Sequence, residues 1–383
     1  MQVALPFGAK AAVNGFIRSA RFLQWVALKC LTILNSCYFD DFATFSVPVI
    51  ASNTDACMSM LMDLLGWAFD REGPKADQFG PTLSVLGVEI DLGRSDEGTV
   101  FIANTAKRRD ELVQRIEAIL SAGSLTKQMA LELRGRLAFA ESQIMGLAGQ
   151  RGLKEVTTHA HARLHNPLIS PALDLALRDL KERLLHSPPR KITCHTVETW
   201  LIFTDAAFEP EPLSGGVGGV LVDPQGKVRA WFGLTLSADL VGRFMSLAQR
   251  TCVGELETLA ATMAILLWGN HICSRQCVMY VDNEGAKYAL TKGHSNNPTV
   301  GRLVHLARAS LEDRDVISWF ARVPSASNIA DPPSRNCQHP LLAQEKCEPE
   351  EAVRNALATN LACLDAVRTE PVVKGRQKDP GSA

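Results

Sequence analysis

The sequence of 383 residues predicts an α/β protein of several domains, and three observations lead to this fold class. A short apolar and aromatic run at residues 37–42 favours a strand hairpin near the N-terminus. Residues 104–190 place apolar side chains at helical spacing. From residue 199 onward, apolar strand-like runs alternate with helical patterns, which predicts a sheet flanked by helices.

Composition narrows the class of protein. Hydrophobic residues make up 46% and charged residues 21%, which is ordinary for a globular protein, and the formal net charge is −1. Residues 101–191, however, carry 15 basic and 9 acidic side chains, so only this segment has the excess of positive charge that a nucleic-acid groove requires.

Cysteine usage and hydropathy bear on location. The ten cysteines form no Cys-x-x-Cys pair, so we expect reduced thiols and no zinc site. No apolar run reaches the roughly 18 residues that a membrane span requires. We therefore expect an intracellular protein, cytoplasmic or nuclear rather than secreted, that has no membrane partner.

The hairpin at residues 37–42 carries two adjacent acids, Asp40 and Asp41. Acids are common in turns, so we expect both at the tip of the hairpin. They would repel each other unless a cation lay between them, and Mg²⁺ prefers such oxygen ligands. The alternative is a solvated turn without function.

The run Tyr38-Phe39-Asp40-Asp41 resembles the Tyr-x-Asp-Asp signature of reverse transcriptases. The resemblance implies that residues 1–100 are part of a polymerase palm. It also implies that Asp40 and Asp41 bind the catalytic metal, with Tyr38 beside the nucleic acid.

Three neighbouring segments extend this resemblance over residues 5–92. The Leu-Pro-x-Gly start at residues 5–8 resembles the family's segment in which the glycine, here Gly8, approaches template and nucleotide. Lys75, after a helix expected at residues 54–70, corresponds to a lysine near the nucleotide phosphates, although a surface lysine fits equally well. The alternating run at residues 86–92 resembles the primer-grip hairpin.

One element of that family is missing from the sequence. The palm uses a further aspartate from an upstream strand, and residues 1–37 contain no Asp or Glu. A two-metal site without a principal ligand cannot hold both cations. We therefore expect an incomplete polymerase site, unless an upstream fingers–palm fragment or a second chain completes it.

The middle segment, residues 101–191, is expected to be helical, with helices at residues 107–120 and 125–147. The resemblance implies a thumb or connection that grips the duplex backbone. Arg134, Arg136, Arg151 and Lys154 are then candidates to contact phosphates, or else they lie on solvated helix faces.

From residue 199, strands are expected at residues 200–205, 215–222, 227–234, 277–282 and 316–320, with a helix at residues 252–269 after the third. Two of these strands end in an acid, Asp205 and Asp282. A lone acid at a strand end is usually a cap or turn residue. The final run at residues 328–335 contains Asp331.

This order resembles the ribonuclease H fold with its mixed five-stranded sheet, over residues 192–340. Asp205, Glu257, Asp282 and Asp331 match the family's set of four acids in order. Glu255 is the alternative to Glu257. The two residues are two positions apart on a helix and face different ways, so only one of them can join the aspartates. The resemblance implies that the four acids bind two Mg²⁺ ions, with Mn²⁺ as an alternative.

The resemblance implies hydrolysis of the RNA strand of an RNA–DNA hybrid by a truncated retrotransposon polypeptide. RNA's 2′-hydroxyl groups would distinguish the two strands. His339 is a weak candidate for the family's mobile histidine, and residues 341–383 are expected to be mostly disordered. The competing hypothesis is a remnant that binds nucleic acid without catalysis.

Overall fold

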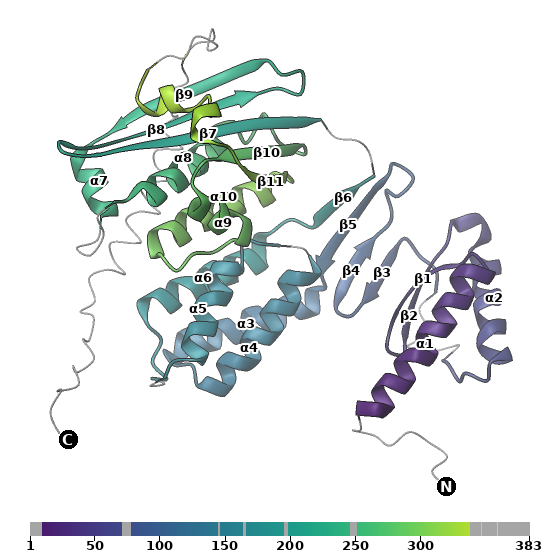
Figure 1. The fold of residues 1–383 in the computed structure, drawn as a ribbon. Coiled ribbons are helices and arrows are strands. Elements are labelled where there is room, and N and C mark those ends of the chain that lie inside the picture. The colour runs from purple at the N-terminus through teal and green to yellow at the C-terminus, as the bar shows by residue number, and fades with distance from the viewer. Residues whose placement is uncertain are drawn as a thin grey trace, which may run out of the picture. The chain divides into compact units, whose positions relative to one another are not determined.

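The computed structural model describes residues 10–70, 78–144, 146–163, 166–194, 198–245 and 251–337, together with Lys346 and Ala358. The chain divides into two compact units, residues 1–105 and residues 106–383 (Figure 1). Gly8, Lys75, His339 and most of the tail at residues 341–383 lie outside the described residues, so the predictions for them remain predictions. The finer domain boundaries also remain predictions.

The first unit begins with a long helix packed against a hairpin and a second helix. Its elements are α1 (Lys10–Cys30), β1 (Leu34–Tyr38), β2 (Asp41–Phe45), η1 (Pro48–Ile50) and α2 (Ala51–Leu64). Leu23 and Ala27 recur at helical spacing on α1 and pack with Met58 and Leu61 of α2 in one apolar cluster. The hairpin predicted around the two acids is confirmed, with Tyr38 paired to Asp41.

Helix α2 begins and ends earlier than the sequence predicted. It starts directly after the turn at Pro48 and stops at Leu64, two residues before Gly66, whose φ is +72°. A glycine in this left-handed conformation is a common helix terminator. The helical pattern at residues 65–70 therefore did not correspond to helix.

Three further strands of the first unit form an antiparallel meander: β3 (Thr82–Val85), β4 (Val88–Asp91) and β5 (Thr99–Asn104). Leu86 and Gly87 connect β3 to β4 with φ values of 53° and 70°. Two positive φ angles at a two-residue connection match the twist of a tight hairpin. The structure does have a hairpin here, but it spans residues 82–91, and the predicted run at residues 86–92 covers only its turn and its second strand.

The second unit begins with four helices that share one apolar core. They are α3 (Ala106–Ala122), α4 (Lys127–Gln143), α5 (Gln150–Ala160) and α6 (Pro171–His186). The hydroxyl groups of Thr126 and Ser170 accept hydrogen bonds from the first turns of α4 and α6, so both helices begin where N-cap residues predict. Their core includes Ile116, Leu133 and Leu177.

A mixed five-stranded sheet follows, in the order β11-β10-β7-β8-β9. Strands β7, β8 and β9 are antiparallel, whereas β10 and β11 run parallel to β7. This is the ribonuclease H-like arrangement expected from the sequence. The five strands of this sheet are β7 (Thr199–Pro210), β8 (Leu213–Val222), β9 (Val228–Leu236), β10 (Gln276–Val281) and β11 (Ile317–Arg322). Strand β6 (Arg190–Thr193) precedes them in the chain and is not part of this sheet.

Helix α8 (Val253–Trp268) packs along the sheet beneath β7 and β8 and in turn contacts α10 (Pro298–Asp313) (Figure 1). It is buried almost all round, which explains its continuous apolar sequence, and Trp268 packs on Phe232 of β9 with ring centroids 5.4 Å apart. The remaining elements of this domain are α7 (Ala238–Phe244), α8 (Val253–Trp268), α9 (Glu284–Lys292), α10 (Pro298–Asp313), η2 (Ser325–Ser327) and α11 (Asp331–Ser334).

Buried ion pairs join the four-helix segment to α10. Asp179 of α6 accepts a hydrogen bond from Arg151 at 2.7 Å and also pairs with Arg302 of α10. Lys154 donates to the backbone carbonyl of Ser295. Arg151 therefore neither contacts phosphate nor lies on a solvated face, because its guanidinium group is buried in an internal ion pair.

No helix among the described residues combines the length and the apolar character that crossing a bilayer requires.

Candidate active site

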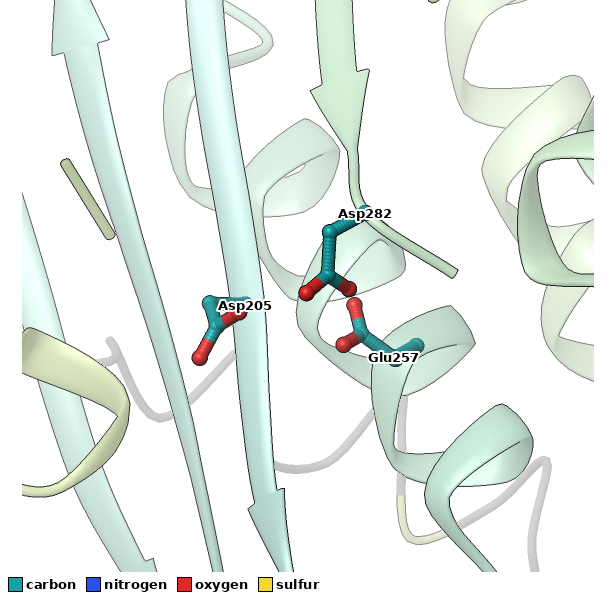
Figure 2. Close-up of side chains that lie close together, drawn as sticks. All are labelled: Asp205, Glu257 and Asp282. Atoms are coloured by element: carbon teal, nitrogen blue, oxygen red, sulfur yellow. The ribbon is translucent and has the colours of Figure 1, made fainter. Parts of the chain in front are cut away.

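Three acidic side chains from three different elements meet at one end of β10. Asp205 lies on β7, Glu257 on α8 and Asp282 directly after β10 (Figure 2). One carboxylate oxygen from each lies within 4.8 Å of the others. Among the described residues, this is the one group of three or more acidic, histidine or cysteine side chains with such spacing.

The sheet register explains why the two aspartates are neighbours. In the parallel pair β7–β10, Thr204 lies opposite Val281, so the next residue on each strand is an aspartate. Asp205 does not end its strand, as the sequence predicted, but lies in the middle of it. The strand continues to Pro210 because β8 pairs with it along its whole second half.

Glu257 reaches the aspartates from the helix that packs on the sheet. Its Oε1 accepts a hydrogen bond from the backbone N–H of Ala206 at 3.3 Å. Its Oε2 is buried and has no hydrogen-bond donor among the described residues. Burial, followed by the neighbouring Asp282 and Asp205 carboxylates, raises the pKa of Glu257 to about 10.

Asp205 is 3% exposed, and each of its oxygens has a donor. Asn328 Nδ2 lies 3.2 Å from Oδ1, and Ser334 Oγ lies 2.6 Å from Oδ2. Burial raises the pKa of Asp205 to about 6, and the charges of Asp282 and Asp331 act in the same direction. The hydrogen bond from Ser334 opposes this shift.

Asp282 is half-buried, and its Oδ2 accepts a hydrogen bond from Ser325 Oγ at 2.9 Å. Figure 2 shows its carboxyl group facing that of Glu257. Two facing carboxyl groups without a cation between them are held together only if one keeps its proton. The raised pKa of Glu257 is consistent with this arrangement.

Asp331, the fourth predicted acid, is not part of the group of three. It begins α11, its side chain is 41% exposed, and Arg335 Nη2 lies 3.4 Å from its Oδ1. It is nevertheless close enough to raise the pKa of Asp205. A role for Asp331 as a metal ligand remains a prediction.

Glu255, the alternative to Glu257, faces a different partner. Its Oε1 accepts a hydrogen bond from Asn297 Nδ2 at 2.6 Å, at the start of α10. The structure thus brings Glu257, and not Glu255, to the two aspartates.

The first unit presents its two acids differently. Asp40 and Asp41 are both exposed at the hairpin tip, and Tyr38 beside them is 51% exposed with its ring against Phe39. Within the described ranges, no third acidic, histidine or cysteine side chain joins them in a metal-binding group. Metal binding at this hairpin remains a prediction.

Sequence reasoning missed the residues that hold the aspartates: Ser325, Asn328 and Ser334. Asn328 and Ser334 belong to the run at residues 328–335, in which the sequence predicted a functional role for Asp331 alone. Only the fold shows that the side chains of Asn328 and Ser334 contact Asp205.

Solved structures similar to this chain include ribonuclease H domains. A ribonuclease H1 of the halophilic archaeon Halobacterium salinarum is 24% identical, with 36% of this chain and 96% of that one covered and a TM-score of 0.30. An N-terminal ribonuclease H domain from Mycobacterium tuberculosis is 14% identical, with 43% and 98% covered and a TM-score of 0.31.

A foamy viral protease–reverse transcriptase in complex with double-stranded DNA is also similar. It is 13% identical, and the match covers 80% of this chain and 49% of that one, with a TM-score of 0.38. No protein-family model matches the sequence, and no curated protein matches it either. The function of the chain is therefore inferred from its own residues.

Proposed function

We propose that residues 192–340 form a metal-dependent ribonuclease H-type endonuclease that hydrolyses the RNA strand of RNA–DNA hybrids. The observation that carries this proposal is the convergence of Asp205, Glu257 and Asp282 within 4.8 Å on a ribonuclease H-like sheet. Three buried or half-buried acids from separate elements are costly to hold together without a cation. Such an arrangement favours a metal site over a set of unrelated caps.

The chemistry of the donor set fits Mg²⁺, with Mn²⁺ as an alternative. All ligand atoms are carboxylate oxygens, and Glu257 Oε2 is a buried oxygen for which the described part of the chain supplies no donor, so a cation would satisfy it. When bound, two divalent ions would activate the attacking water and stabilise the leaving 3′ oxygen. We assign Asp205, Glu257 and Asp282 as ligands and Asp331 as the fourth.

The protein residues contribute rigid placement. Asp205 is fixed inside a strand that is paired on both sides, and Glu257 is fixed on a helix that is buried almost all round. Groups held in this way are preorganised, and preorganised groups lower a barrier because they do not have to reorganise during the reaction. We assign contact with solvent and substrate to Asp331, because its side chain is partly exposed.

The polymerase-like part of the chain supports a retrotransposon origin. We propose that residues 1–100 are a partial palm whose site is incomplete, since Asp40 and Asp41 have no third ligand within the described residues. The alternatives are a polymerase completed by an upstream fragment or a second chain, and a remnant that binds nucleic acid without catalysis.

The test is cleavage of a labelled RNA–DNA hybrid by the full chain in Mg²⁺. We expect nicks in the RNA strand of the hybrid and none in the same RNA when it is single-stranded. Asp282→Asn should abolish cleavage while its circular-dichroism spectrum stays native. Asp239→Asn is the matched control, since this aspartate is 83% exposed on α7, and it should cleave as the wild type does.

Two outcomes would contradict the proposal. Equal cleavage by wild type and Asp282→Asn would identify a contaminating nuclease. Hybrid binding without cleavage at any Mg²⁺ or Mn²⁺ concentration would favour the non-enzymatic remnant.

A further inference from the structure

The segment at residues 323–337, which we call the strap, follows the last strand and returns across the sheet. Its short helix α11 packs on β7, β8 and β9. A small apolar cluster that includes Ala330, Val220 and Trp231 lies beneath it, apart from the main core. The strap therefore covers the face of the sheet that α8 does not occupy.

Glycines let the strap lie directly on the strands. A Cβ atom on Gly216 or Gly218 of β8 would collide with the backbone of Ser334, and one on Gly233 of β9 would collide with Pro333. Backbone cannot move aside as the end of a flexible side chain can. The strap can therefore lie this close to β8 and β9 only because these glycines have no Cβ atom.

From this position the strap holds both aspartates of the site. Ser334 Oγ lies 2.6 Å from Asp205 Oδ2, and Asn328 Nδ2 lies 3.2 Å from Asp205 Oδ1. Asn328 Nδ2 also lies 2.9 Å from the carbonyl oxygen of Thr204, which ties it to the strand itself. Ser325 Oγ donates to Asp282 Oδ2 at 2.9 Å.

We propose that the strap sets the metal affinity of the site, with Ser334 and Asn328 as positioning residues for Asp205. The inference rests on the proposed metal site. Carboxylates that bind metals are usually oriented by hydrogen bonds from a surrounding layer of residues, and loss of such a partner typically weakens metal binding about 10–100-fold.

The geometry gives the reason that a positioning role is required here. Asp205 faces two other acids, so electrostatic repulsion favours rotation of its carboxyl group away from Glu257 and Asp282. A donor on each oxygen of Asp205 opposes that rotation and leaves the remaining lone pairs free. Ser334 Oγ also lies 2.8 Å from the carbonyl oxygen of Asp331, which is a second acceptor for its single proton.

The experiment measures Mg²⁺ binding to the full-length chain by calorimetry and by the Mg²⁺-dependent rise in melting temperature. Ser334→Ala removes one donor. Gly218→Ala displaces the strap without removing any polar group, so it is an independent second variant. Ser310→Ala is the control for the serine, because Ser310 of α10 is also buried but its Oγ accepts a hydrogen bond from Arg314.

A matched control for the glycine is Gly242→Ala, since a Cβ at this helical position meets no atom of the described residues within 4 Å. We expect Mg²⁺ affinity to fall about tenfold or more in Ser334→Ala and in Gly218→Ala, and to be unchanged in both controls. Excess Mg²⁺ should restore cleavage in Ser334→Ala, which a merely structural defect would not allow.

The outcomes separate the two proposals. If the wild type neither binds Mg²⁺ nor cleaves hybrid, the proposed function fails. If the wild type does both, and folded Ser334→Ala or Gly218→Ala binds Mg²⁺ within twofold of wild type, the strap inference is overturned while the function stands.

Discussion

Replacing Asp205 with asparagine should stabilise the metal-free protein at neutral pH by about 3 kcal/mol, since one pKa unit corresponds to about 1.4 kcal/mol. The structure raises the pKa of this carboxyl group from 3.8 to about 6. Near pH 7 the folded protein therefore carries a charge that burial and the neighbouring acids oppose. Asparagine has the same shape and no charge.

The substitution costs little in hydrogen bonding. The asparagine oxygen still accepts from Asn328, and its amide group donates to Ser334 Oγ. Ser334 can then direct its own proton to the carbonyl oxygen of Asp331, 2.8 Å away. Every polar atom keeps a partner, so the loss of charge dominates the change in the free energy of unfolding.

The sign of the pH dependence follows from proton binding. A carboxyl group with a raised folded-state pKa holds its proton more tightly in the folded protein than in the unfolded chain. For Asp205, this contribution favours folding below pH 3.8 and is lost as the pH rises through about 6. The advantage of Asp205→Asn should therefore be full at pH 7.5 and smaller at pH 4.5.

Thermal melts of the full chain in EDTA provide the assay. A difference of about 3 kcal/mol corresponds to a rise of roughly 6–12 °C in the melting temperature of a domain of this size. Added Mg²⁺ should raise the melting temperature of the wild type and leave that of the variant unchanged.

Asp223→Asn is the control, because the pKa of this solvent-inaccessible aspartate is lowered, against the effect of burial, by hydrogen bonds from the backbone N–H of Lys227, from Arg229 and from the backbone N–H of Gln225. Its replacement should destabilise the protein at neutral pH. If Asp205→Asn is no more stable than wild type in EDTA at pH 7.5, the account of the site as mutually repelling acids is refuted.

Three further predictions concern the other parts of the chain. Asp179→Ala should destabilise the second unit by about 3–5 kcal/mol in urea unfolding, because it leaves two buried arginines unpaired; an unchanged midpoint would contradict this. Arg134 and Arg136 lie on an exposed part of α4, and replacing both with glutamine should flatten the slope of log affinity for hybrid against log salt concentration. An unchanged slope would mean that other residues contact the phosphates. The wild-type chain should not incorporate dNTPs on a primed RNA template, and incorporation that is lost in the Asp40→Asn and Asp41→Asn double variant would show that the hairpin has a ligand outside the described residues.

The sequence by itself determined the local elements. The hairpin at Asp40 and Asp41 and the helices α3 and α4 depend on patterns within a few residues, so propensity and periodicity predicted them. The hairpin around Leu86 and Gly87 was implied by the resemblance. The order of strands and helices after residue 199 resembled the ribonuclease H fold, and that resemblance implied the mixed sheet that the structure has.

Only the tertiary structure decided which acids meet and what holds them. Glu255 and Glu257 are equally acidic in sequence, and their separation depends on which face of α8 packs on β7. From the sequence, Arg151 was a candidate for a phosphate contact or for a solvated helix face. In the structure it is buried in an ion pair with Asp179 of α6. Ser334 and Asn328 contact Asp205 across more than a hundred residues of chain, and contacts of that range depend on how the sheet, its glycines and the strap pack in three dimensions.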